Sequence, residues 1–290
     1  MTAAADERAR DGTGTHRDVV DVQIRSGSLL LAARIARSPG QASAAATAIV
    51  FSGEDRFLEV IEETGGPLES WERASIGPLM LTVEESLARW SLRVEAPAVE
   101  ASAELRALTP PLELGEAATA AVGRTAHIER YSQLCEARGT ARLGKRSRSL
   151  DGLAVRTHRW GPTGDAGRTR FLTAATESGA LLSIAAVRPP DAAHGDELVG
   201  GLTLAAGNGP APGPLPFETV RLSTVFDQHG VPVKAGAELF RPGEEFPSRL
   251  AGTALAGASP ATGAPPASLT VFALALDGVP AFGLYEVEGA

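Results

Sequence analysis

Short segments in which apolar and polar residues alternate, closed by turn residues at steady spacing, run through this chain and limit what it can fold into. In 88–95 the apolar residues fall at every second position, which is typical of a half-buried antiparallel strand. A hairpin is predicted where 269–276 and 281–287 flank Asp277-Gly278. Because no long helical pattern interrupts these segments, the sequence predicts an all-β chain of antiparallel sandwiches or barrels.

The length and the amino terminus set the domain organisation. The chain has 290 residues, more than the usual single-core size of about 100 to 200, so two domains and one large β domain are both consistent with it. Residues 1–17 are polar and lack the apolar core of a secretory signal, and we expect a disordered tail there. No apolar run of about 18 residues occurs, so no integral membrane segment is predicted. We expect a soluble, cytoplasmic protein.

The charge and the cysteine content of the chain limit the partners, disulfides and metal sites that we expect. The chain carries 27 basic and 35 acidic residues, a net charge of −8. It joins no Lys/Arg cluster to stacking aromatics, so nucleic acid is not an expected partner. The basic run 138–148 is interpreted as a hairpin tip around Gly144, with a phosphate site as the alternative. Cys135 is the single cysteine, which excludes an intramolecular disulfide and a thiolate metal site and fits a reducing cytoplasm.

The stretch 150–162 gathers chemically active side chains into one short run that ends in a Gly-Pro stop. Its alternation predicts a strand with Arg156, His158 and Trp160 on one face. A cation, a titratable imidazole and an aromatic wall on one face fit the binding of a single ligand. The structural alternative is that Trp160 fills a core, that His158 is a satisfied or rim histidine and that Arg156 is a solvated charge.

A second candidate face lies in 126–143, where polar and aromatic residues occur at every second position. They are His127, Glu129, Tyr131 and Gln133. If 126–143 is a strand, these four side chains share one face. We interpret this face either as the polar lining of a cavity or as a solvent-facing stripe.

Common catalytic and cofactor motifs are absent from the sequence. It contains no P-loop and no Gly-x-Ser-x-Gly nucleophile elbow. The turn at 207–210 lacks the third glycine and the helix of a dinucleotide fingerprint. The five histidines show no metal-ligand spacing, although a spatial group of His127, His158 and Glu129 stays open. We therefore predict neither a cofactor nor a metal.

Three motifs, taken in order, carry a resemblance to a known family. They are His127-x-Glu129, Gly139-Thr-Ala-Arg-Leu, and Asp151-Gly152 leading into His158-x-Trp160-Gly161-Pro162. This order resembles the carotenoid 1,2-hydratase (hydroxyneurosporene synthase) superfamily, which includes lipocalin-like Diels-Alderases of natural-product pathways. The chain is most similar to its uncharacterised bacterial members, and segments 77–90 and 283–286 agree with the family's pattern. The resemblance implies two consecutive lipocalin-like antiparallel β-barrel or sandwich domains, which we place at 18–137 and 138–290.

The resemblance also implies that His158 and Trp160 line a pocket near the junction of the two barrels. Further substrate-binding candidates are His127, Glu129 and Tyr131. Two departures bear on the reaction: Thr157 stands where family members commonly carry an acid, and 180–187 has neither the Tyr nor the Asp expected of the hydratases. Because protonating an unactivated alkene needs a strong and well-placed acid, these departures argue against carotenoid hydration.

The function implied is a cofactor-independent cyclase or isomerase, pericyclase-like or hydratase-like, that acts on a hydrophobic polyene, polyketide or terpenoid. Such chemistry needs a shaped apolar cavity and hydrogen-bond donors, for which Arg156 and His158 are the catalytic candidates. The alternative is a non-catalytic lipocalin-like carrier of such a molecule. A third hypothesis is an interaction module that uses 241–266, whose Pro, Gly, Ala and Ser content predicts a long loop. The oligomeric state is left open.

Overall fold

The structure, a computed structural model, describes residues 16–114, 120–162, 167–189, 192–193, 197–205, 213–258 and 267–289. Most of the tail predicted at 1–17 lies outside the described residues. Its last two residues, His16 and Arg17, are described, and they open the first strand. Among the described residues, no helix has both the length and the apolar character needed to cross a bilayer.

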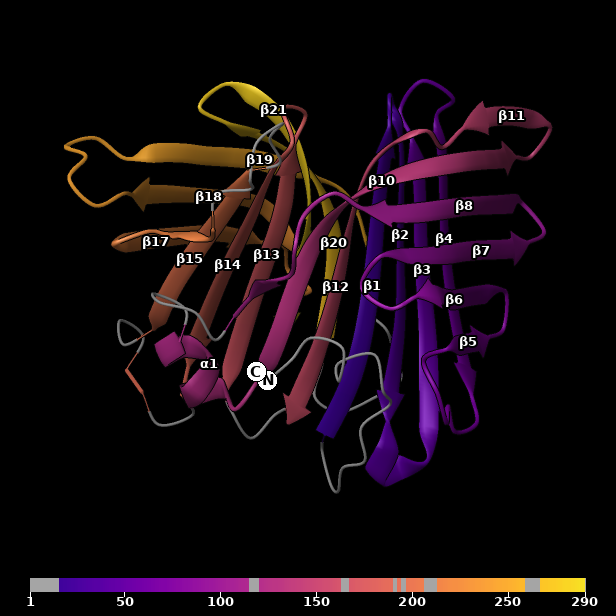
Figure 1. Cartoon of the computed structure of the whole chain (residues 1–290), viewed down its shortest axis with the longest axis horizontal. Helices are drawn as coiled ribbons and strands as arrows, with labels where there is room; N and C mark the ends of the chain where they lie inside the picture. Colours follow the sequence, from indigo (N-terminus) through magenta and orange to yellow (C-terminus); the bar gives the residue numbers. More distant parts are fainter. Residues whose placement is uncertain are drawn as a thin grey trace. The chain divides into compact units, whose positions relative to one another are not determined.

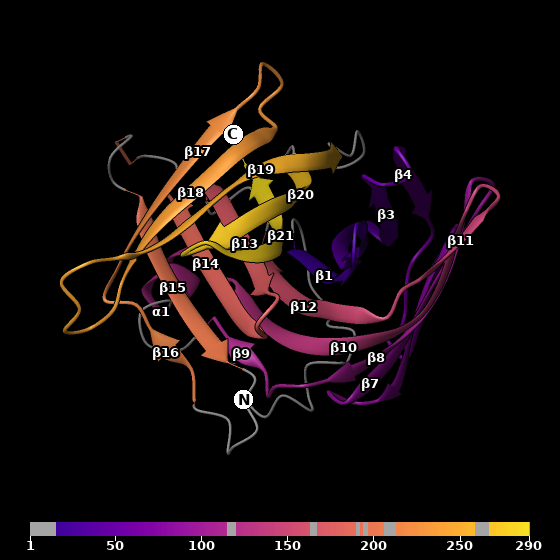
Figure 2. The same ribbon diagram turned by 90° about the horizontal axis from the view of Figure 1, so that it is seen from above.

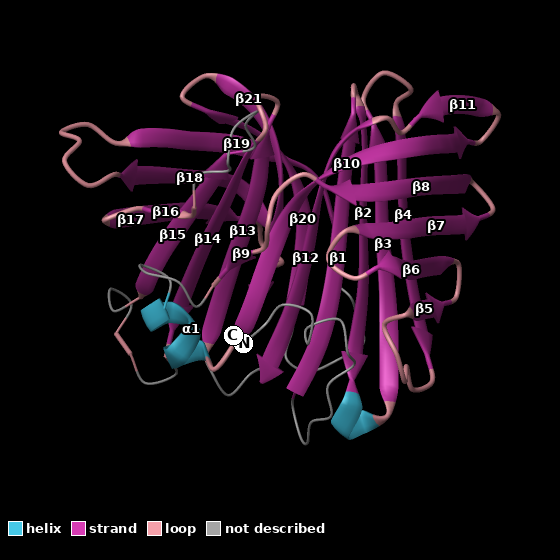
Figure 3. Cartoon of the chain, viewed as in Figure 1, coloured by secondary structure: helices cyan, strands magenta, loops and turns pink. Residues whose placement is uncertain are grey.

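The all-β prediction is confirmed, and the strands form two antiparallel sheets (Figure 1, Figure 3). The first sheet consists of β1 (His16–Ser26), β2 (Leu29–Ser38), β3 (Ser43–Ser52), β4 (Phe57–Gly65), β5 (Arg73–Ile76), β6 (Leu79–Glu85), β7 (Arg89–Ala96), β8 (Val99–Ala107), β9 (Leu112–Glu113), β10 (Glu129–Leu143), β11 (Arg146–Ser149) and β12 (Gly152–Pro162). Its main path runs β4-β3-β2-β1-β12-β10-β8-β7-β6-β5, with β9 and β11 paired to β10.

The second sheet follows in the chain. It consists of β13 (Arg168–Thr176), β14 (Ala180–Arg188), β15 (Leu198–Ala205), β16 (Leu215–Pro216), β17 (Thr219–Phe226), β18 (Pro232–Phe240), β19 (Ser248–Ala258), β20 (Ala267–Leu276) and β21 (Val279–Glu288). Its order is β16-β15-β14-β13-β21-β20-β19-β18-β17. The sheet curls so that β17 also contacts β15, as the view from above shows (Figure 2).

Two compact units divide the chain. The first unit comprises Met1–Pro111 and Gln133–Trp160, and the second comprises Leu112–Ser132 and Gly161–Ala290. The chain therefore passes between the units within β10 and within β12. The domain boundary that the sequence suggests at residue 137 stays a prediction.

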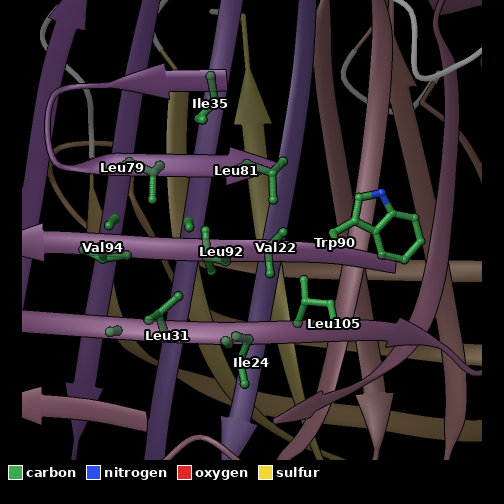
Figure 4. Close-up of a cluster of buried hydrophobic side chains, with 14 of the residues drawn as sticks. Val22, Ile24, Leu31, Ile35, Leu79, Leu81, Trp90, Leu92, Val94 and Leu105 are labelled. Atoms are coloured by element: carbon green, nitrogen blue, oxygen red, sulfur yellow. The ribbon is translucent and has the colours of Figure 1, made fainter. Parts of the chain in front are cut away.

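The first unit has an apolar core on the inner face of its curled sheet. Figure 4 shows this core, to which β1, β2 and β6 to β8 contribute alternate residues such as Val22, Leu31, Leu81 and Leu92. Trp90 of β7 belongs to the same cluster and is fully buried. Because side chains on a strand alternate between two faces, the core residues of each strand fix which of its other residues also point inward.

The second unit has its own apolar core. It is built from inward residues of β13 to β15 and β17 to β21, together with Phe217. Outside that sheet, the short helix α1 (Ala120–Ala126) packs against β14, where Val122 and Ala126 meet Ala185 and Val187. Sequence patterns did not predict this helix, whose seven residues are too few for a clear helical periodicity.

Two glycines show how local sequence shapes the strands. Asp277 and Gly278, at φ of 49° and 83°, form the predicted turn between β20 and β21, and two consecutive residues with positive φ are what a type I′ hairpin turn requires. Gly152 opens β12 against β1, and a β-carbon there would lie 2.0 Å from the carbonyl oxygen of Arg25. The Asp151-Gly152 pair found in the sequence therefore has a structural role, because the two strands approach closely only at a glycine.

Two sequence predictions about local structure are wrong. The segment 241–266 is not one long loop, because β19 occupies 248–258 and pairs with β18 and β20. Its Ala and Gly residues resemble loop composition but are small enough for a crowded sheet. His127 is not on a strand: it lies in a turn after α1, with a left-handed φ of 53°, and β10 begins at Glu129.

Candidate functional site

A carboxylate lies inside the first unit, beside its apolar core. Asp18 is in phase on β1 with Val20, Val22 and Ile24, all members of the core, so its side chain also points inward. It is 0% exposed. A buried carboxylate is costly unless hydrogen bonds and opposite charges compensate it, so its neighbours define the site.

Three side chains surround this carboxylate. The indole Nε1 of Trp71 donates to Oδ2 at 2.8 Å, and Nε2 of His158 lies 2.6 Å from Oδ1. The guanidinium of Arg37, on β2, lies 3.8 Å from Oδ2. We call Asp18, Arg37, Trp71 and His158 the Asp18 cluster. The three partners of the carboxylate come from β2, from the segment before β5 and from β12, so it joins parts that are distant in the sequence.

Aromatic rings flank the cluster. The rings of Trp71 and His158 meet edge to face, with centroids 5.6 Å apart and an interplanar angle of 70°. His16 and Trp160 lie two residues along β1 and β12 from Asp18 and His158, and the centroids of their rings are 5.4 Å apart. Both are partly exposed, whereas His158 is 4% exposed. The polar atoms of the Asp18 cluster are thus more deeply buried than the rings of His16 and Trp160, which are partly exposed.

Arg156 lies one step further inward on β12. Its guanidinium stacks over the ring of Trp90 at 4.6 Å from the centroid, and the residue is 1% exposed. A cation over an indole face is held by the ring's electron density. Ala154, on the same face of β12, belongs to the apolar core, which confirms that Arg156, His158 and Trp160 share the inner face. The solvated alternative for Arg156 is therefore wrong.

The neighbouring strands β1 and β12 position these groups. His16 contacts Trp160, Asp18 contacts His158, and the backbone of Arg25 approaches Gly152. Residue numbers rise along one strand as they fall along the other, so the two strands run antiparallel. This pairing is what places a carboxylate opposite the histidine.

The other predicted residues are placed differently. His127 and Glu129 are exposed and Tyr131 is buried, and all three belong to the second unit. Gln133 is buried, and its amide donates to the carbonyl oxygens of Leu87 and Thr109. His127, His158 and Glu129 form no metal-binding group, and no group of three or more potential ligands is placed to hold a metal among the described residues.

Sequence analysis missed Asp18, Arg37 and Trp71. A signal for Asp18 was present, because an acidic residue in phase with Val20 and Val22 is unusual on a strand's apolar face. No local signal exists for Trp71, which lies outside any strand.

Two grooves lie elsewhere. One, of about 610 Å³, is in the first unit and is lined by Arg93, Val94, Glu95, Ala96, Glu100, Ala101, Ser102, Thr140, Ala141, Arg142 and Ser147. The other, of about 350 Å³, is in the second unit and is lined by Arg221, Leu222, Ser223, Gly236, Ala237, Glu238, Arg249, Leu250 and Ala251. None of the predicted site residues lines either groove.

Chemically, the Asp18 cluster is a histidine held by a carboxylate. A hydrogen bond from one ring nitrogen to a carboxylate fixes the tautomer and plane of an imidazole and leaves the other nitrogen to accept a hydrogen bond or a proton. Residues 18–212, which contain most of this cluster's sheet, match a family described as a domain of unknown function, DUF7064. The chain belongs to the DUF7064 family. The match begins at Asp18 itself and includes every residue of the cluster.

Solved structures resemble this DUF7064 protein in fold. A protein from Nitrosomonas europaea designated AttH aligns with a TM-score of 0.66 at 14% identity over 94% of this chain and 92% of its own. CghA, solved together with Sch210972, aligns with a TM-score of 0.58 at 14% identity over 95% and 89%. CghA alone gives 0.59 at 13% over 95% and 88%. No curated protein matches the sequence.

These likenesses establish the fold and no more, because identity is low. The lipocalin-like architecture of two consecutive antiparallel β domains is confirmed for this DUF7064 protein. The specific resemblance to carotenoid hydratases gains no support from them.

Proposed function

We propose that this DUF7064 protein binds a hydrophobic polyene, polyketide or terpenoid at the inner face of its first unit and acts on it as a cofactor-independent cyclase or isomerase. The observation that carries this proposal is the His158 imidazole held 2.6 Å from a buried carboxylate, on a face that also bears tryptophan. The low identity to AttH and CghA leaves this proposal to rest on the residues themselves.

Each residue has a distinct proposed role. His158, oriented by Asp18 through Nε2, would act through Nδ1 as a proton carrier. Arg156 would place a positive charge near a developing oxyanion. Trp71 and Trp160 would supply aromatic surface for an apolar substrate. The substrate contacts predicted for His127, Glu129 and Tyr131 rest on their spacing in the sequence and on the family resemblance.

The proposed reactions fit a site without a co-reactant. An isomerisation returns to the substrate the proton that it removes, and a pericyclic cyclisation moves no proton. Both need a folded substrate and a polarised carbonyl group, and the isomerisation also needs a proton carrier. The crystal structure of CghA with Sch210972 supports the idea that this fold accommodates a small organic molecule.

The three tryptophans of the chain allow the proposal to be tested directly. All three, Trp71, Trp90 and Trp160, belong to the first unit, and each contacts a residue of the candidate site or its flanking pair. Tryptophan fluorescence therefore originates in the first unit. We suggest all-trans-retinal, a polyene with a conjugated carbonyl, as the probe. Saturable quenching measures binding, and chromatography of the extracted probe measures isomers or cyclised products.

The variants separate an enzyme from a carrier. For an enzyme, His158→Gln should abolish product formation while quenching stays saturable. The matched control His229→Gln, in an exposed turn of the second unit, should behave as wild type. Saturable quenching without any product in the wild type would favour the carrier. Absence of saturable quenching, or product formation unchanged by His158→Gln, would overturn the proposed role of this face.

A further inference from the structure

A second group of charged residues lies inside the second unit. Arg168 and Arg170 are in phase on β13 with Leu172 and Ala174, which belong to the unit's core, so both point to its inner face. There they reach β17, which is not a neighbour of β13 in the sheet. The guanidinium of Arg168 stacks over the ring of Phe226 at 4.4 Å from its centroid.

Arg170 is fully engaged. Its Nε donates to Oε1 of Glu197 at 3.0 Å, and its second terminal nitrogen donates to Oε2 of the same carboxylate. Its remaining nitrogen donates to Thr224 at 2.7 Å and to the Tyr285 hydroxyl at 3.2 Å. Burial raises the pKa of that hydroxyl against the opposing effect of Arg170, so Tyr285 is a neutral member of the group.

Among the described residues, Arg168 makes no carboxylate contact like that of Arg170 with Glu197. Its cross-strand neighbour on β14 is Arg188, another guanidinium. Its Nε is buried and makes no hydrogen bond in the part of the chain that the structure describes. Burial, and then repulsion from Arg170 and Arg188, lowers the pKa of Arg168. We call Arg168, Arg170, Arg188 and Glu197 the arginine cluster.

We propose that Arg168 binds the carboxylate of a small organic acid, whose apolar part lies beside Phe226. A planar guanidinium recognises a carboxylate through paired hydrogen bonds, and stacking on Phe226 holds the fork in place beforehand. A second negative charge would repel Glu197, so a monoanion fits better than a phosphate dianion. This site lies within the second unit and does not depend on the function proposed for the Asp18 cluster.

Octanoate provides a suitable probe, with 1-octanol as its uncharged equivalent and inorganic phosphate as a dianion. Titration calorimetry on the full chain should show saturable octanoate binding and much weaker binding of octanol and phosphate. Equal binding of octanol would overturn the proposed charge recognition. Phosphate binding tighter than octanoate would overturn the assignment to a carboxylate.

Variants of Arg168 identify the site. Arg168→Gln should weaken octanoate binding about tenfold or more, because it removes charged hydrogen bonds. Arg221→Gln is the matched control: Arg221 also stacks over an aromatic ring, Phe240, but its side chain is 71% exposed. Its octanoate affinity should equal that of wild type.

A folding defect in Arg168→Gln would leave Arg168→Lys as the deciding variant. Lysine keeps the charge near Phe226 but lacks the two-pronged donor, so affinity should still fall severalfold. Circular dichroism melting verifies that each variant folds. Wild-type affinity for octanoate in a folded Arg168 variant would contradict the assignment.

Discussion

The Nε2 atom of His158 lies 2.6 Å from Oδ1 of Asp18, although 140 residues separate the two in the chain. The contact exists because β1 and β12 are neighbours in the first sheet. The same carboxylate accepts the indole N–H of Trp71. The Asp18 side chain thus joins β1, β12 and the segment that contains Trp71. Its replacement should lower both the stability of the protein and the activity proposed for His158.

Asp18→Asn should destabilise the protein. The amide keeps an oxygen for the indole of Trp71 but removes the negative charge that faces His158 and Arg37. Because breaking a buried pair leaves the partner charge uncompensated, we expect the free energy of unfolding to fall by about 3 kcal/mol. Chemical denaturation measures it.

The control for this substitution is an exposed ion pair of the same unit. Glu85 and Arg89 pair with side chains that are 60% and 50% exposed. Glu85→Gln should change the unfolding free energy by less than about 1 kcal/mol. If Asp18→Asn and Glu85→Gln lowered the unfolding free energy by similar amounts, the Asp18 cluster would contribute no more to stability than an exposed ion pair.

Gly152→Ala should disrupt the pairing of β1 with β12. The added β-carbon would lie 2.0 Å from the backbone oxygen of Arg25, and backbone cannot move aside as a flexible side chain can. We expect a loss of about 3 kcal/mol or more in unfolding free energy. At Gly53 the nearest atom to a β-carbon is 3.7 Å away, so Gly53→Ala should cost less than about 1 kcal/mol. Equal melting temperatures of the two variants would refute the close approach.

The thiol of Cys135 should be inert in the native protein. Burial raises its pKa to about 12, from an ordinary value of 9.0. A thiol reagent at pH 8 should label it only when denaturant unfolds the chain. Since the folded pKa is raised, the stability linked to the protonated thiol is complete below pH 9 and is lost as the pH rises toward 12. Cys135→Ala should lessen this alkaline loss; rapid native labelling would contradict burial.

Asp55 should contribute to stability only above acid pH. Hydrogen bonds from Arg148 and then Arg146 hold its pKa well below the ordinary 3.8. For a depressed pKa, the contribution is present above the ordinary value and is lost as the pH falls below it. Asp55→Asn should therefore flatten the acid limb of the stability profile. Glu62→Gln, at an exposed position of β4, should leave that limb as in wild type. An unchanged acid limb in Asp55→Asn would argue against the pairing.

The basic run 138–148 illustrates what sequence could and could not supply. The hairpin around Gly144 was predictable, because a glycine inside a run of charged residues is a local turn signal, and the structure places Gly144 at a φ of 59° between β10 and β11. The partners of its arginines were not. Arg142 pairs with Glu100 on β8, while Arg146 and Arg148 pair with Asp55 in the turn before β4. These choices depend on which strands lie side by side.

The sequence by itself determined the all-β class, the hairpins at Gly144 and at Asp277-Gly278, and the shared face of Arg156, His158 and Trp160, because alternation and turn chemistry act between residues close in the chain. Only the tertiary structure decided that Asp18 and Trp71 meet His158, since β12 pairs with β1 rather than with a strand next to it in sequence. It also decided that Arg168 reaches Phe226 across the second unit. Strand order is set by the burial of whole sheets, and no short stretch of sequence contains that information.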